Sequence, residues 1–238
     1  MSRLATPLFC IALALFTFFA IPGHTWLQQD SQIFVPILEH ERDSTLLRND
    51  ILVQRSHVAY TLYDEIAVVL RGITGLPFRN VLAAEQIAAR AFGIWGLLLL
   101  AESLGVTRRR AMIVAAICSL GARIVGPEVL TTEYEPTPRA FAVPLLVCAL
   151  GLAAHRRWLA SGLAVAVAVL YHAPTALPVL VAGLCRLFAN RVNGSVTARA
   201  SSALYAFFSS RSACLRVEIS LTMLRNPTGA PVCSSLIA

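Results

Sequence analysis

Apolar runs alternate along this chain with short clusters of arginine, and this alternation constrains the fold more than any other feature. Of the 238 residues, 57% are hydrophobic and only 14% are charged, whereas a water-soluble domain usually carries about 25% charged residues. A lipid bilayer is the environment that suits such a composition. Short basic loops stay on the cytoplasmic side of a membrane, so the clusters also predict a cytoplasmic N-terminus. The clusters are Arg3, residues 108–110, residues 155–157, and the pair Arg186 and Arg191.

The runs predict an all-α, multi-pass membrane protein with about six transmembrane helices. Residues 4–21 are expected to be an uncleaved anchor rather than a signal peptide, because the run is longer than a usual signal core and no small-x-small site follows it. A single helix over residues 158–188 would reach about 46 Å, against a hydrocarbon core of about 30 Å. We therefore expect two spans that meet at residues 171–174, where Pro174 interrupts the helix; one helix there would leave five spans. The remaining expected spans are 86–104, 111–125 and 140–154.

The chain is expected to consist of a transmembrane domain, residues 1–190, and a tail, residues 191–238. The domain has two outer loops, residues 23–80 and 126–139, which contain acidic segments. The tail has scattered arginine, many serines and no apolar run of spanning length. It predicts an irregular polar segment on the cytoplasmic side, or the frameshifted end of a longer gene.

Residues 58–73 of the first outer loop predict an amphipathic helix along the membrane surface. Tyr60, Tyr63 and Ala67 can share its apolar face, while Asp64 lies on the polar side.

Composition excludes some other classes of function. The formal net charge is +7, but the arginines lie mostly at the ends of spans and no basic stripe is interleaved with aromatic residues, so nucleic acid is not an expected partner. Six cysteines are present without a CxxC or Cys/His spacing, so neither a zinc site nor a disulfide framework is expected. His40 lies between two glutamates but lacks the spacing of a metal-binding motif.

Polar residues suited to chemistry gather in the predicted outer segments. Asp30 follows the first span closely, and a carboxylate at a membrane surface can act as a general base or bind a metal ion. Glu133 and Glu135 lie in the second outer loop, where Pro136 and Pro138 disfavour a helix. His172 is expected at an outer turn on the same face.

Two arginines flank the second outer loop. Arg123 and Arg139 can jointly hold a phosphate, because a guanidinium fork binds phosphate oxygens bidentately. The plainer interpretation is that both mark the membrane interface by snorkelling, and that Asp30 and His172 are solvated interfacial residues.

This layout resembles the GT-C superfamily of polytopic glycosyltransferases, which includes the protein mannosyltransferases. The shared features are a first span that runs outward, a large outer loop that opens with an acid (Asp30), a surface helix in that loop (58–73), and an outer acidic loop before an arginine-led span (133–139). Many members carry two adjacent acids after the first span, whereas Asp30 stands alone here.

The resemblance covers residues 1–190 and only the N-terminal part of such an enzyme, so it implies a truncated glycosyltransferase. The implied activity is sugar transfer from a polyprenyl-phosphate donor on the outer face of a bacterial inner membrane. Asp30 would be the catalytic base, Glu133 or Glu135 would bind a metal ion or the acceptor, and Arg123 and Arg139 would contact the donor phosphate. A divalent cation is the candidate cofactor. The competing interpretations are a non-catalytic membrane scaffold and a transporter subunit; only an enzyme needs these side chains within one cavity.

Overall fold

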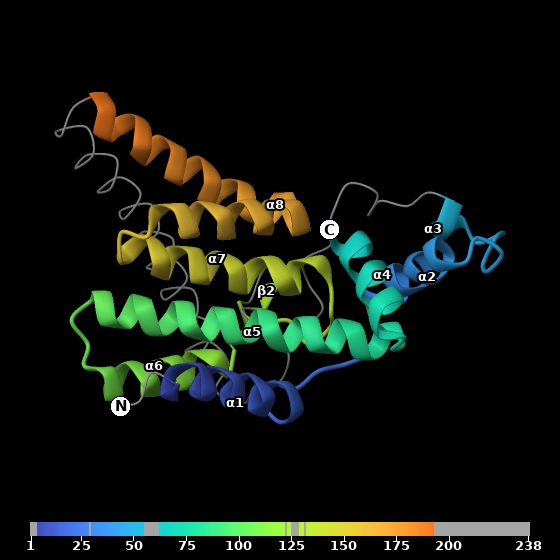
Figure 1. Cartoon of the computed structure of the whole chain (residues 1–238), viewed down its shortest axis with the longest axis horizontal. Helices are drawn as coiled ribbons and strands as arrows, with labels where there is room; N and C mark the ends of the chain where they lie inside the picture. Colours follow the sequence, from blue (N-terminus) through green and yellow to red (C-terminus); the bar gives the residue numbers. More distant parts are fainter. Residues whose placement is uncertain are drawn as a thin grey trace, which may run out of the picture. The chain divides into compact units, whose positions relative to one another are not determined.

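The computed structural model describes residues 4–28, 30–54, 62–121, 123–124, 129–130 and 132–192, and the side chains of 123–124, 129–130 and 184–192 lie outside that description. The described chain is mainly helical, which confirms the predicted all-α class (Figure 1). It divides into two units, Met1–Leu180 and Val181–Ala238, and the packing described below is that of the first. The helices are α1 (Ala5–Phe19), α2 (Ser31–Arg42), α3 (Ile51–Gln54), α4 (Leu62–Thr74), α5 (Phe78–Ser103), α6 (Arg108–Ser119), α7 (Pro138–Ala154) and α8 (Trp158–Val192), and a short antiparallel pair joins β1 (Arg123–Ile124) to β2 (Val129–Leu130).

Helix α5 is central, and its most extensive contact is with α7; α1 and α6 also pack against it (Figure 1). The α5–α7 contact depends on small residues. A Cβ added to Gly96 would lie 2.5 Å from backbone atoms of Cys148, and one added to Gly151 would lie 2.5 Å from the carbonyl oxygen of Gly96. Small residues that let two backbones approach in this way are typical of helix pairs in membranes.

The connections between these helices gather at two ends of the bundle. At one end, Arg108 at the start of α6 contacts Thr6 in the first turn of α1. At the other end, the backbone N–H of Thr25, after α1, donates to the carbonyl of Tyr134, before α7, at 3.1 Å. The structure thus separates the basic turn at 108–110 from the acidic segment before α7, as the alternation of charge along the sequence predicts.

Two helical segments of the described chain, Phe78–Ser103 and Trp158–Gly183, are long and apolar enough to cross a membrane, where the sequence predicts six spans. Helices α1 and α7 are apolar but shorter. Several helices turn large apolar side chains outward, including Leu8, Ile11 and Phe16 on α1, Ile113 and Ile117 on α6, and Leu159 and Leu163 on α8.

Helix boundaries depart from the predicted spans in three places. Helix α5 begins at Phe78 rather than residue 86, and α6 ends at Ser119 rather than residue 125. Helix α7 begins at Pro138, which corrects the expectation that this proline excludes a helix: at the first helical position, the missing N–H has no intrahelical partner to lose. Helix α8 is bent at His172, where φ is −156° and ψ is 87°, at the interruption that the sequence predicts.

Helix α4 occupies the described part of the predicted surface helix, and residues 58–61, including Tyr60, lie outside the description. Tyr63 and Ala67 are buried as expected. Asp64 is also buried, with only 4% of its surface exposed, so its assignment to the polar side was wrong. The reason is that α4 packs against α2, which brings the carboxyl groups of Asp64 and Glu41 close enough to interact.

Candidate functional site

The carboxylate of Glu135 holds the start of α2. One oxygen accepts the backbone N–H of Gln28 at 2.8 Å, and the other accepts the N–H of Ser31 at 2.9 Å. The first N–H groups of a helix have no partner within the helix, so an acidic side chain placed there satisfies them and interacts favourably with the helix dipole. Glu135 is only 5% exposed. It therefore acts as a buried cap, supplied from the segment before α7.

Asp30 precedes α2 in the position that an N-cap residue occupies, yet its side chain makes no capping hydrogen bond. Its backbone carbonyl instead accepts the N–H of Ile33 at 2.9 Å. Because Glu135 caps the helix, the exposed carboxylate of Asp30 has no hydrogen-bond or ion-pair partner within the described part of the chain. This arrangement leaves Asp30 available to a proton, a cation or a substrate hydroxyl.

Arg90 and Gln86 of α5 join the two segments that meet at this end of the bundle. The Nη2 atom of Arg90 donates to the carbonyl of Gly23 at 2.9 Å and to that of Glu133 at 2.8 Å. The amide of Gln86 donates to the same Glu133 carbonyl at 2.9 Å and to that of Tyr134 at 3.3 Å. An arginine near the end of an apolar run is expected to snorkel to the membrane interface, but Arg90 is only 5% exposed and is held inside the bundle instead. We call residues 22–28, 30–31 and 132–139, held together in this way, the platform.

Glu133 and Arg139 form an ion pair within the platform. The Nε atom of Arg139 lies 2.6 Å from Oε1 of Glu133, although the N–H is not aligned with that oxygen as a hydrogen bond. The Glu133 side chain is 8% exposed and that of Arg139 is 35% exposed. Arg139 thus meets an anion of the chain itself, and a phosphate would have to share it with Glu133.

Arg123 and His172 are the other two predicted site residues, and neither forms part of the contacts described so far. The side chain of Arg123 lies outside the described residues, although its backbone is part of β1. The Nδ1 atom of His172 lies 2.7 Å from Oγ1 of Thr175 and accepts the N–H of the same residue at 3.3 Å, so the ring supports the bend in α8. His172 is also within electrostatic reach of Arg139. The structure therefore brings Asp30, Glu133, Glu135 and Arg139 onto the platform, with His172 beside it.

Sequence reasoning missed Glu85 of α5. Neither oxygen of its side chain is exposed, and neither has a hydrogen-bond partner among the residues described. The helix places it one turn from Leu82 and one turn from Ala89, two members of the core that also contains Tyr63 and Tyr171. The available signal was an acid inside an otherwise apolar helix, which is by default a functional residue in a membrane protein.

Besides Glu85, a pair of acidic side chains, Asp64 and Glu41, lies between α2 and α4. Burial, together with the neighbouring carboxyl groups of Glu65 and Glu41, raises the pKa of Asp64 to about 7. The pKa of Glu41 is also raised, chiefly by burial. One oxygen of Asp64 has no partner in the described structure. Within the residues described, no group of three or more His, Cys, Asp or Glu side chains is arranged to hold a metal ion, which gives the candidate divalent cation no preformed site there.

An open cleft lies beside the platform, between α1, α5 and the two platform segments, and Asp30, Glu133 and Arg139 are not among the residues that line it. Thr25 and Pro136 of the platform do line it. Both the platform and the cleft offer polar groups to a ligand. No protein-family model, curated protein or solved structure matches the chain.

Proposed function

We propose that this chain is a multi-pass membrane protein whose platform serves transfer of a sugar from a polyprenyl-phosphate donor, in the manner of the GT-C superfamily. The observation that carries the proposal is that the carboxylates of Glu135 and Asp30 have different roles at the start of α2. Glu135 caps α2 from a distance of 104 positions in the sequence, and the carboxylate of Asp30 is exposed and has no partner among the residues described. A general base must accept a proton from the acceptor hydroxyl, so it must not be engaged as a cap.

The proposal includes the topology. In it, α1, α5, α6, α7 and the two arms of α8 cross the bilayer of a plasma membrane, with the platform outside. The support is the outward apolar side chains of α1, α6 and α8, the close α5–α7 packing, and the basic turn at the end opposite the platform. Reporter fusions at residues 30 and 134 are expected on one side of the membrane and a fusion at residue 109 on the other.

The activity is tested in membranes that contain the chain. A polyprenyl-phosphate hexose with a radiolabelled sugar is added, and transfer of label to the acceptors in the membrane is measured. Asp30→Asn is expected to lower the transfer rate by about 100-fold or more, the contribution of a general base. Its level in the membrane is expected to stay unchanged, because the side chain is exposed. Asp43→Asn, at a half-exposed acid that directly follows α2, is the control and should retain the wild-type rate.

The competing function is a non-catalytic scaffold. It is favoured by the Glu133–Arg139 ion pair, which occupies the arginine expected to bind phosphate, and by the absence of Asp30 from the lining of the cleft. Wild-type membranes that transfer no label, or an Asp30→Asn variant as active as the wild type, would remove the catalytic assignment. The scaffold interpretation would then stand.

A further inference from the structure

The cleft beside the platform encloses about 400 Å³ between the last turn of α1 and the first turns of α5. A volume of this size falls within the range of small-molecule sites. It accommodates a polar head group and the first part of one hydrocarbon chain, but not a whole two-chain lipid.

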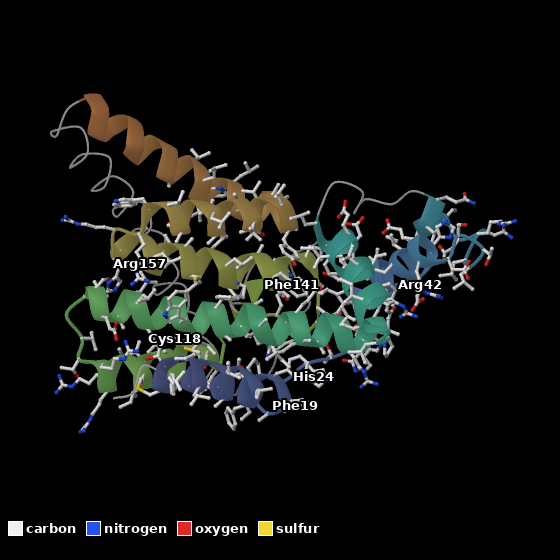
Figure 2. All side chains as sticks on the ribbon, in the orientation of Figure 1. Phe19, His24, Arg42, Cys118, Phe141 and Arg157 are labelled. Atoms are coloured by element: carbon white, nitrogen blue, oxygen red, sulfur yellow. The ribbon has the colours of Figure 1, made fainter. Side chains whose placement is uncertain are left out.

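The walls of the cleft are mostly apolar. Phe18 is buried in the wall, Phe19 is 70% exposed at its edge, and Trp26 and Ile87 complete it. Figure 2 shows Phe19 and His24 together at one end of α1, and the His24 ring stacks on that of Phe18 with 4.1 Å between ring centroids. An exposed phenylalanine beside a stacked aromatic pair offers a surface that fits a hydrocarbon chain.

The rim of the cleft carries a positive charge. Arg79 lies in the first turn of α5 and is exposed, and no acidic side chain among the residues described pairs with it. Pro77 precedes α5 and supplies no side-chain cap, so the positive end of the helix dipole adds to the arginine at the same rim. Asn80 is a further polar group at this rim. Together these groups suit an anion.

We propose that the cleft binds a membrane lipid whose head group contains a phosphate, with the phosphate at Arg79 and the start of one chain against Phe18, Phe19 and Ile87. In the topology proposed above, the cleft lies at the level where a lipid head group is expected. Helix α4 ends immediately before α5, and its exposed Val69 and Ile73 mark the same boundary with apolar side chains. The proposal does not depend on sugar transfer, because an ordinary phospholipid satisfies the same chemistry.

The test uses Trp26 as a reporter inside the cleft. The chain has three tryptophans, and replacing Trp95 and Trp158 by phenylalanine leaves Trp26 alone. The full-length protein in a neutral detergent is titrated with phosphatidylglycerol brominated on one acyl chain, which quenches a tryptophan in contact with it. Diacylglycerol with the same brominated chain is the comparison without phosphate. We expect quenching by phosphatidylglycerol at an apparent affinity at least about tenfold higher than for diacylglycerol, as expected for a charge-assisted contact.

Two variants assign the effect to the cleft. Arg79→Gln is expected to weaken quenching by phosphatidylglycerol about tenfold and to leave diacylglycerol unchanged, whereas Arg109→Gln, the same change at an exposed position of α6, should alter neither. Ala84→Phe, which fills the cleft from α5, is expected to reduce quenching by both lipids. The proposal is overturned if Arg79→Gln behaves like Arg109→Gln, or if diacylglycerol quenches as well as phosphatidylglycerol. It is also overturned if inorganic phosphate at the lipid's concentration displaces the lipid, since the site would then belong to free anions.

Discussion

Replacing Gly96 by alanine tests the packing of α5 against α7. The new Cβ would lie 2.5 Å from Cα and N of Cys148 and from the carbonyl oxygen of Val147, against 3.4 Å for an ordinary contact. All three atoms belong to the backbone, so no change of rotamer relieves the overlap. The two helices must move apart, and the contacts of Gly151, which faces Gly96 from α7, are lost with them.

The magnitude follows from comparison with a glycine that has free space. Gly72 of α4 has no atom within 4 Å of an added Cβ, so Gly72→Ala changes only helix propensity and should stabilise the protein by up to about 1 kcal/mol. Gly96→Ala receives the same propensity gain, and overpacking removes about 1–3 kcal/mol. The difference between the two variants therefore isolates the steric contribution.

The assay is the free energy of unfolding in detergent, from denaturant titrations followed by far-ultraviolet circular dichroism. We expect Gly96→Ala to be less stable than Gly72→Ala by about 1–3 kcal/mol. Gly151→Ala should behave like Gly96→Ala, and the double variant should lose less than the sum, because both changes separate the same two backbones. A Gly96→Ala protein as stable as Gly72→Ala would show that the helices do not approach as closely as the structure has them.

Two further predictions concern polar groups near the platform. Arg90→Leu removes the side-chain donor of the Gly23 carbonyl and leaves the Glu133 carbonyl with the Gln86 amide alone. It should lower the free energy of unfolding by about 2–3 kcal/mol, whereas Arg110→Leu, at an exposed position of α6, should change it little; equal effects would contradict the role of Arg90. Burial raises the pKa of Asp64 from 3.8 to about 7 in the folded chain, so the folded state binds the proton more tightly and loses stability as pH rises through this window. Asp64→Asn should therefore be more stable than the wild type at pH 8, with an advantage that disappears as pH falls toward 4; an advantage independent of pH would refute the assignment.

The helical class and the separation of charge were predictable because both depend on patterns within short segments of the sequence. Apolar runs and arginine clusters each lie within a few residues, and Pro174 marks the bend that the structure has at His172. Helix ends were less predictable: α5 extends back to Phe78 because polar residues such as Asn80 and Gln86 face the cleft and the platform rather than lipid. A rule that counts hydropathy along the chain ends a span at such residues.

The contacts of the site were not predictable from the sequence for a different reason. Arg90 lies where a snorkelling arginine is expected, and only the fold shows that two carbonyls from distant segments meet its Nη2 atom. Glu85 lies one residue before the predicted span 86–104 and is not among the site residues that the sequence predicts. Its burial among core residues, without a hydrogen-bond partner in the described part of the chain, depends on contacts between distant segments, which no local pattern contains.

Glu135, rather than Asp30, caps α2, and this links the stability of the fold to the candidate chemistry. An aspartate at an N-cap position usually accepts the N–H groups of its own helix, and that engagement would hold the carboxylate ionised and weaken it as a base. Glu135 takes those hydrogen bonds instead, and it does so from the segment that leads into α7. The position of α7 is fixed in turn by the glycine contact with α5. Separation of α5 from α7 should therefore loosen the start of α2 and free Asp30 to cap its own helix, so that packing in the bundle controls the availability of an exposed carboxylate at its end.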